Sequence, residues 1–290
     1  MKQARLQALA AAVLFSTGGA AIKIAAFSAA QVSMLRSGVA AVALILFLRG
    51  QIRWQPIAFL IGVVYAATLT LFVLSTKQTT AANAIFLQST APLYLLVLSP
   101  VFLQEPIRRR DIAYVSVVAI GMVCCFLGQR SATATAPNPL AGNVLAIACG
   151  AVWALTLLAL RWAERGQNRS GLGVTAVIAG NAIACLVALP FALPLPHASV
   201  AAWSTVIYLG VFQIALAYLA LTAAMRHLPA LDASLLLLLE PVLNPVWTWL
   251  VRGERPATWT LVGGAAILVA AAAKSMYDAR VPPGVAQALP

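Results

Sequence analysis

The sequence contains few charged residues. Of its 290 residues, 9% are charged and only 7 are acidic, whereas 62% are hydrophobic and the mean hydropathy is +0.92. Soluble domains are about a quarter charged, because a packed core needs a polar shell against water. A single core of this length could not hide so much apolar surface. The composition therefore excludes an ordinary water-soluble domain and predicts a protein that folds in lipid.

Residues suited to catalysis or metal binding are equally scarce. The two histidines, His197 and His227, fall in loops predicted on opposite membrane faces, which excludes a catalytic triad or a histidine-rich metal site. Four cysteines lie in apolar runs without CxxC spacing, and they are Cys124, Cys125, Cys149 and Cys185. No Walker motif is present, so ATP does not drive this chain. We expect no enzyme activity, no cofactor and no metal.

The formal net charge of +12 is not typical of a nucleic-acid-binding surface. Basic patches that bind phosphate lie on polar, water-exposed faces. Here most Lys and Arg residues stand at the ends of apolar runs, where they anchor spans at the membrane surface. We expect lipid and a small-molecule substrate as partners, no nucleic acid, and a monomer.

Ten apolar stretches are long enough to cross a bilayer. A span needs about 20 residues, because a helix rises about 1.5 Å per residue through about 30 Å of hydrocarbon. The stretches are 5–26, 28–48, 56–77, 80–103, 108–128, 140–162, 171–193, 203–226, 229–251 and 257–277. The start, MKQARLQALAAAVLFSTGGA, has signal-peptide features, but its match to a later segment favours a mature helix.

Loop charges predict the orientation. With the N-terminus inside, the cytoplasmic side holds Lys2, Arg5, Arg49, Arg53, Arg108, Arg109, Arg110, Arg161, Arg165, Arg169, Arg226, Lys274 and Arg280. The outer side holds Lys23, Lys77, Arg130, Arg252 and Arg255. Cytoplasmic loops are enriched in Lys and Arg, so both termini are predicted to be cytoplasmic and the protein to be multi-pass in the inner membrane.

The two halves of the chain repeat each other. At one constant shift the matched pairs are Trp54 with Trp203, Lys77 with Arg226, Asn83 with Asp232, Pro92 with Pro241, and Glu105 with Glu254. Five spans per half is an odd number, so the second half enters from the opposite side and the repeats are inverted, an architecture of secondary transporters. The prediction is an all-α integral membrane fold with repeats over 1–130 and 140–277, an extracytoplasmic linker over 131–139, and a cytoplasmic tail over 278–290.

Two segments carry a resemblance to a known family. STAPLYLLVLSPVFLQE (89–105) and LLEPVLNPVWTWLVRGE (238–254) each place a proline in a span that ends at a glutamate turn, and FSTGGAAIK (15–23) and MLRSG (34–38) also fit. Together they resemble the drug/metabolite transporter superfamily, in its ten-helix EamA-type branch. The resemblance implies a secondary transporter, similar to bacterial exporters of amino acids and related metabolites. The chain differs from the family where Gly180 or Asn181 stands opposite Arg36, and where LQEP lacks the usual glycine before the glutamate.

Glu240 stands within a leucine run, directly before Pro241. A charge at the centre of a span costs about 2.5–3.5 kcal/mol, and the five preceding leucines offset about 1.5–3 kcal/mol of it. Pro241 lacks an amide donor and is expected to free the carbonyl of residue 237. Glu240 can bind a substrate ammonium or exchange a proton, or it can hydrogen-bond the backbone at the kink. Both alternatives place it in the protein interior.

Other charged residues have similar alternatives. Arg36 can bind a substrate carboxylate, or pair with Glu240 or with helix carbonyls. Glu105, Glu254 and Asp232 are expected to cap the helices that follow them. Lys23, Lys77 and Arg226 are expected to extend toward the interface. Pro92, Pro241, Glu105, Glu254 and Arg36 are therefore assigned gating or structural roles.

By resemblance, the first, third, fourth, sixth, eighth and ninth spans surround a central path. Their polar and aromatic members are the predicted substrate-binding residues: Ser16, Thr17, Thr68, Asn83, Gln88, Ser89, Thr90, Tyr94, Trp153, Thr156, Gln213, Tyr218, Ser234, Glu240 and Asn244. Trp153 and Tyr218 can stack on a planar or cationic solute or simply pack between helices. The sequence thus predicts an exporter of small metabolites, with aromatic or neutral amino acids as the leading class. The alternatives are a cationic-drug exporter and, in another class, a membrane scaffold or lipid flippase.

Overall fold

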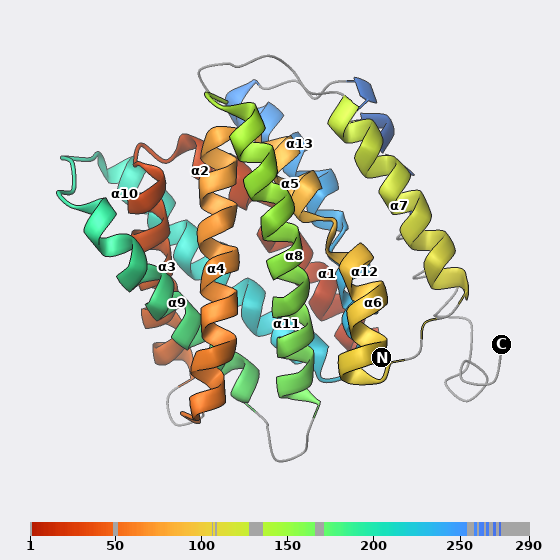
Figure 1. The fold of residues 1–290 in the computed structure, drawn as a ribbon. Helices are drawn as coiled ribbons and strands as arrows, with labels where there is room; N and C mark the ends of the chain where they lie inside the picture. Colours follow the sequence, from red (N-terminus) through yellow and green to blue (C-terminus); the bar gives the residue numbers. More distant parts are fainter. Residues whose placement is uncertain are drawn as a thin grey trace.

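The structure, a computed structural model, describes residues 2–48, 52–105, 107, 109–127, 136–165 and 171–253, with separate positions between 258 and 273. Within these residues every regular element is a helix (Figure 1). The helices are α1 (Lys2–Ser16), α2 (Gly18–Ile24), α3 (Ala29–Phe47), α4 (Pro56–Gln78), α5 (Ala81–Gln88), α6 (Ala91–Leu103), α7 (Arg109–Leu127), α8 (Pro139–Glu164), α9 (Leu172–Ala192), α10 (Val200–Tyr208), the π-helix η2 (Leu209–Leu216), α11 (Ala217–Met225), α12 (Ala230–Leu236) and α13 (Leu239–Arg252).

Within the described residues, eight helical segments are long and apolar enough to cross a membrane. They are Lys2–Ile24, Ala29–Phe47, Pro56–Gln78, Ala81–Leu103, Pro139–Glu164, Leu172–Ala192, Val200–Met225 and Ala230–Val251. Each matches one of the ten expected stretches. The expected span over 108–128 is the helix α7, and the one over 257–277 lies largely outside the described residues. The all-helical membrane class is confirmed, and the count of ten stays a prediction.

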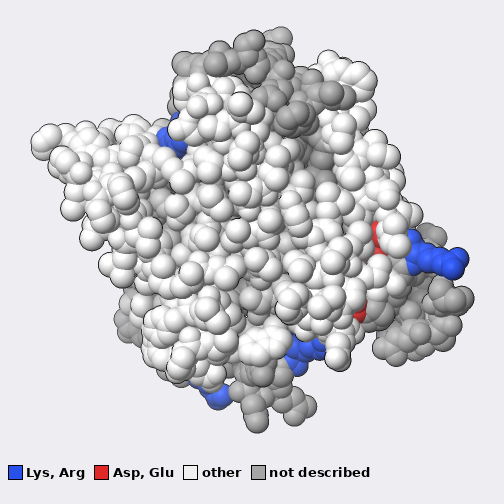
Figure 2. Space-filling model, viewed as in Figure 1, with Lys and Arg blue, Asp and Glu red and all other residues white. Residues whose placement is uncertain are grey.

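The outer surface of the bundle is apolar. Large hydrophobic side chains such as Phe47, Val97 and Phe191 are more than half exposed. Figure 2 shows a broad middle zone without charged side chains, with the blue and red atoms toward its edges. Exposed apolar surface of this extent is stable only against lipid tails.

Three of the spans are broken. α1 gives way to α2 at Thr17, α5 to α6 at Ser89 and Thr90, and α12 to α13 at Leu237 and Leu238. The second and third breaks occupy matching places in the two halves. Each lies just before a helix with a proline in its first turn: Pro92 is the second residue of α6, and Pro241 is the third of α13. Proline fits the first turn of a helix because its missing amide donor is not needed there.

The break before Pro241 corrects one expectation from the sequence. The carbonyl of Leu237 is not left free, because it accepts a hydrogen bond from the Glu240 amide at 2.9 Å. The hydrogen bonds of this turn join residues three apart instead of four. A second example is the bond from the Leu238 amide to the Leu235 carbonyl, at 3.3 Å. Glu240 therefore lies in the first turn of α13 rather than in the middle of a continuous helix.

Glycines allow the central helices to approach closely. α4 packs against both α8 and α9. At the crossing of α4 and α9, a Cβ built on Gly180 would lie 2.7 Å from the Gly62 carbonyl oxygen and 2.5 Å from a ring carbon of Tyr65. On α8, a Cβ on Gly150 would lie 2.9 Å from the carbonyl oxygen of Gln88, at the α5–α6 break. Small residues at such contacts are typical of membrane helix pairs.

Two lysines fasten helix ends to each other instead of extending toward the interface, which corrects the sequence expectation. Lys23, on α2, donates to the carbonyl of Thr79 at the end of α4, at 2.7 Å. Lys77, on α4, donates to the carbonyl of Ala25 at the end of α2, at 3.1 Å. The last carbonyls of a helix carry partial negative charge and lack intrahelical partners, so a cation there is favourable.

The close crossing of α4 and α9 gives a stability prediction. We expect Gly180→Ala to lower the free energy of unfolding by about 1–3 kcal/mol, because the new methyl group meets backbone and ring atoms that cannot all retreat. Gly38→Ala is the control, since its Cβ would meet only the Cys185 Sγ, at 3.2 Å. Thermal unfolding of the purified protein in detergent measures both. Equal Tm values for the two variants would contradict the close packing.

Candidate functional site

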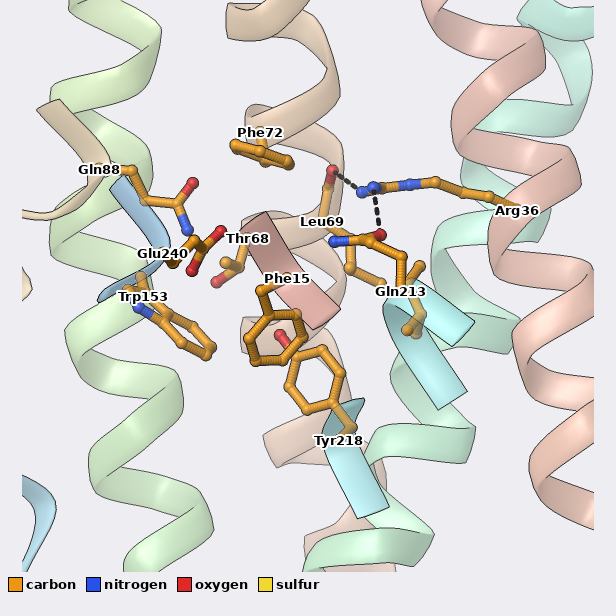
Figure 3. Close-up of a pocket in the computed structure, with 11 residues that line it drawn as sticks. Phe15, Arg36, Thr68, Leu69, Phe72, Gln88, Trp153, Gln213, Tyr218 and Glu240 are labelled. Atoms are coloured by element: carbon orange, nitrogen blue, oxygen red, sulfur yellow. Dashed lines mark hydrogen bonds between the residues drawn. The ribbon is translucent and has the colours of Figure 1, made fainter. Parts of the chain in front are cut away.

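A small pocket lies at the centre of the bundle, where α1, α3, α4, α5, α8, η2, α11 and α13 meet (Figure 3). Its volume is about 30 Å³, which admits water but no metabolite. The lining residues are Phe15, Arg36, Thr68, Leu69, Phe72, Gln88, Trp153, Gln213, Ile214, Tyr218 and Glu240. In this conformation the helices are closed tightly around the pocket.

Arg36 is completely buried on one side of the pocket. One terminal nitrogen donates to the Leu69 carbonyl at 3.0 Å, and the other contacts the Gln213 side-chain oxygen at 3.5 Å. The guanidinium carbon lies 5.9 Å from the centre of the Phe72 ring, a cation–π arrangement. Among the described residues its Nε has no hydrogen-bond partner. Of the three alternatives for Arg36, the bond to a helix carbonyl is formed and the pairing with Glu240 is not. Binding of a substrate carboxylate stays a prediction.

Gln213 reaches Arg36 because its helix is locally wound as a π-helix. η2 lies between α10 and α11 and has more residues per turn than an α-helix. Such segments often occur at functional sites. Gly18 makes room for the side chain, since a Cβ there would lie 2.8 Å from the Gln213 Nε2. The glycine at the α1–α2 break and the π-helix together place this amide at the pocket.

Glu240 and Gln88 lie on the side of the pocket opposite Arg36 (Figure 3). Glu240 is 7% exposed, and among the described residues its carboxylate makes no hydrogen bond or ion pair with a side chain. The Gln88 Oε1 is likewise buried without a partner in the described part of the chain. Both residues stand at helix breaks. Unpartnered buried polar atoms that face one cavity are suited to a polar ligand.

A cluster of aromatic rings closes one end of the pocket. Tyr218 contacts Phe15 at 4.9 Å between ring centroids, Tyr65 at 4.6 Å and Trp153 at 6.2 Å, all edge to face. The Tyr65 hydroxyl also accepts a hydrogen bond from Asn181 at 3.3 Å. From Trp153, α8 continues for about two turns to Arg161, so the cluster separates the pocket from the end of the bundle where α8 and α11 terminate.

An ion pair joins the helices at that same end. The Arg161 Nε donates to Glu105 at 2.8 Å, and its Nη1 donates to the Met225 carbonyl at 2.6 Å. The second Glu105 oxygen accepts from the Ala230 amide at 3.1 Å. Glu105 therefore links the end of α6 to α8 and to the start of α12. Glu105 was expected to cap the helix that follows it in sequence. It instead caps α12, far along the chain.

Two further arginines brace this end. Arg226 donates to Glu164 at 2.9 Å, and the other Glu164 oxygen accepts from the Gly173 amide at 3.1 Å. Arg165 donates to the carbonyl of Leu103, at the end of α6. The turn after α6 depends on Gln104, which has a left-handed backbone (φ 53°) where the second half has Gly253 (φ 67°). The missing glycine of the first-half turn therefore leaves the turn conformation unchanged. Arg226 is bound to a carboxylate while its side chain is 43% exposed, so its expected extension toward the interface stays a prediction.

The predicted site residues divide into three groups. Thr68, Gln88, Trp153, Gln213, Tyr218 and Glu240 line the pocket, as does Arg36, which was assigned a structural role. The predicted residues that do not line it are Ser16, Thr17, Asn83, Ser89, Thr90, Tyr94, Thr156, Ser234 and Asn244. Glu254 lies outside the described residues. The substrate-binding role of all of them stays a prediction.

Several residues of the second group support the pocket from behind. Thr156 shares a hydrogen bond of 2.9 Å with Thr68, and Ser16 accepts from the Trp247 indole at 2.9 Å. Thr17 lines a separate apolar cavity of about 370 Å³ between α2, α10 and α13. Ser89, Thr90 and Ser234 bond to carbonyls of their own helices, and these helices begin or end at the breaks.

The sequence reasoning missed four lining residues, Phe15, Leu69, Phe72 and Ile214. All four are apolar residues in apolar spans, so their residue type does not show whether they face the pocket or the lipid. Spacing offers one signal, because Leu69 and Phe72 lie within one turn of Thr68, on the same face of α4.

The ion pair at the end of the bundle gives a prediction about access to the site. We expect Glu105→Gln to open this end more often, since a loss of about 1–2 kcal/mol changes a population about 5–30-fold. A reporter cysteine at Thr156, with the four native cysteines replaced, would then react faster with a membrane-impermeant thiol reagent. Glu164→Gln is the matched control, because Glu164 joins α8 to α11 and α9 but not to α6. Equal labelling rates in both variants would rule out a gating role for Glu105.

Comparisons with known proteins agree with this fold. A solved crystal structure superposes with a TM-score of 0.76, covering 97% of this chain and 99% of that chain. At 19% sequence identity this likeness shows the fold alone.

Sequence relatives are transporters. The pseudopaline exporter CntI of Pseudomonas aeruginosa is 26% identical over 288 residues, 95% of this chain and 96% of that protein. The uncharacterised transporter YdfC of Bacillus subtilis is 26% identical over 211 residues, 72% of this chain and 67% of that protein. A model of the EamA-like transporter family matches residues 3–127 and again 140–275. The chain is therefore a multi-pass membrane protein that belongs to the EamA-like transporter family.

Proposed function

We propose that this transporter is a secondary carrier that exports a small zwitterionic metabolite, with aromatic or neutral amino acids as the leading class. One observation carries the proposal. Arg36 and Glu240, a basic and an acidic side chain, are both buried and line the same pocket, yet they do not pair with each other. A solute with a carboxylate and an ammonium group would complement both.

The energetics favour a ligand of this kind. A buried charge without a partner is costly, and a bound counter-charge offsets that cost. The guanidinium of Arg36 still has an unpartnered Nε, and planar guanidinium groups bind carboxylates through two parallel hydrogen bonds. Glu240 and Gln88 offer oxygen acceptors to an ammonium group. Phe15, Trp153 and Tyr218 provide an apolar wall for an uncharged or aromatic side chain.

The orientation is part of the proposal. Ten spans in two inverted five-helix repeats, 1–130 and 140–277, place both termini in the cytoplasm. The segment 131–139 is then extracytoplasmic and 278–290 a cytoplasmic tail. In this orientation Arg161, Arg165 and Arg226 lie at the cytoplasmic end, in agreement with the enrichment of basic residues there. The carrier acts as a monomer in the inner membrane.

In alternating access, the contacts that close each end of the bundle would open in turn. The aromatic cluster and the Glu105–Arg161 pair close the cytoplasmic end, and Lys23 and Lys77 hold α2 to α4 at the other end. The breaks at α5–α6 and α12–α13 are the places where these spans can bend. Rocking of two bundles around a fixed central site is how inverted-repeat transporters work. The name of the relative CntI supports export as the direction.

Two alternatives differ in chemistry. A cationic-drug exporter would use Glu240 and the aromatic rings but would not need Arg36. A scaffold or lipid flippase would show no saturable flux of a soluble solute. The buried Arg36 favours the zwitterion over the cation, because a second positive charge beside a cationic ligand would repel it.

Transport by the protein in liposomes tests the proposal with three matched solutes. They are phenylalanine, phenethylamine, which lacks the carboxylate, and phenylpropionate, which lacks the ammonium group. We expect saturable flux of phenylalanine and at least about tenfold lower kcat/KM for each analogue, because a missing charge-assisted bond costs about 1.5–3 kcal/mol. Arg36→Gln and Glu240→Gln should each reduce phenylalanine flux about 10–100-fold, and the exposed Arg109→Gln should not.

The other outcomes are equally informative. Flux of phenethylamine without flux of phenylalanine would identify a cation exporter. Absence of saturable flux for every solute offered, in a protein that unfolds cooperatively, would overturn the carrier assignment. Arg36→Lys distinguishes loss of charge from loss of fold, since it keeps the charge and should restore part of the flux.

A further inference from the structure

A second polar cavity lies at the arginine-rich end of the bundle, separate from the central pocket. Its volume is about 420 Å³, and it opens between the end of α3, the start of α9 and the end of α11. Its polar lining includes Arg53, Thr175, Thr222 and Arg226. α11 divides the two cavities, because Tyr218 lines the central pocket and Leu219 lines this one. We propose that this cavity binds the phosphate group of an anionic phospholipid.

The two arginines supply positive charge to the cavity. Arg53 is exposed, and within the described part of the chain only its backbone amide is bound, to the Thr175 hydroxyl at 3.2 Å. Arg226 gives its Nε to Glu164, so the two terminal nitrogens of its guanidinium can bind another anion. Glu164 is the acidic partner found here among the described residues.

The first turn of α9 lines the cavity with Gly171, Val174 and Thr175. Glu164 already accepts a hydrogen bond from the Gly173 amide at 3.1 Å and pairs with the Arg226 Nε at 2.9 Å. The donors that remain for an anion are therefore the guanidinium of Arg53 and the terminal nitrogens of Arg226.

The position favours a lipid over a soluble phosphate. The cavity lies where the apolar segments Ala29–Phe47, Leu172–Ala192 and Val200–Met225 end, which is where hydrocarbon gives way to headgroups. Trp54, next to Arg53, is 54% exposed and stacks on Phe59 at 5.6 Å between centroids. Exposed tryptophan is typical of the membrane interface. Arg53 is thereby placed at headgroup depth.

The walls match the remainder of such a ligand. Leu48, Val174 and Leu219 form an apolar side beside the arginines, suited to the glycerol and first methylene groups of a lipid. Basic pockets between membrane helices on the cytoplasmic side bind anionic lipid headgroups, and each basic residue near an anionic surface contributes about 1 kcal/mol. A phosphatidylglycerol-type headgroup meets both requirements.

The thermal stability of the whole protein in detergent, with and without short-chain phosphatidylglycerol, tests this assignment. A ligand that binds only the folded state raises the Tm. We expect phosphatidylglycerol to raise the Tm of the wild type more than phosphatidylcholine does. Arg53→Gln should lose at least half of that difference, and Arg109→Gln, an exposed arginine at the start of α7, should lose none of it. Because the Arg53 side chain makes no described hydrogen bond, the variant should fold normally.

Inorganic phosphate separates the two sources of the ligand. An equal rise in Tm with millimolar phosphate would overturn the lipid assignment and indicate a site for soluble anions. A full phosphatidylglycerol shift in Arg53→Gln, or the same loss in Arg109→Gln, would show that the effect is general surface charge and would overturn the site itself. Neither result depends on transport activity, so this test is independent of the proposed substrate.

Discussion

A helix that breaks inside a bilayer must bury its freed backbone groups in protein, because lipid offers no hydrogen bonds. The breaks at α5–α6 and α12–α13 impose this condition on the whole bundle. Gly150 allows α8 to pack directly on the first break, where a Cβ would lie 2.9 Å from the Gln88 carbonyl oxygen. At the second break, the tightened turn satisfies the Leu237 carbonyl, which accepts a hydrogen bond from the Glu240 amide. The breaks in turn place Gln88 and Glu240 at the pocket, so the site and the packing have one cause.

The charged side chains of the bundle differ in whether they have partners. At the ends of the bundle Lys23 and Lys77 bind helix carbonyls, and Arg161 and Arg226 bind carboxylates. In the centre, Arg36 and Glu240 face one cavity without pairing with each other. Under the proposed function, this separation leaves both side chains available to a ligand.

The sequence predicts much of this architecture and less of the site. Length and hydropathy locate eight described spans, and the disturbed turn before Pro241 was expected, whereas the breaks at α1–α2 and α5–α6 were not. Glu240 stands out because it is a charge in an apolar run, whereas Phe15 and Phe72 cannot be distinguished from neighbouring hydrophobes. The partners of Glu105 were predicted wrongly, since capping was assigned to the next helix in sequence. Its actual partners, Arg161 and Ala230, follow only from how distant helices pack.

The size of the central pocket connects these features to transport. At about 30 Å³ it cannot hold an amino acid, so the proposed substrate could bind there only after the helices around it have separated. The closure toward the arginine-rich end uses both packed rings and the Glu105–Arg161 pair, which join α1, α4, α6, α8, α11 and α12. A ligand that bridges Arg36 and Glu240 would occupy the space between these helices and compensate the charges. Binding energy from the two ends of a zwitterion is therefore available to expand the pocket, which a singly charged solute could supply only in part.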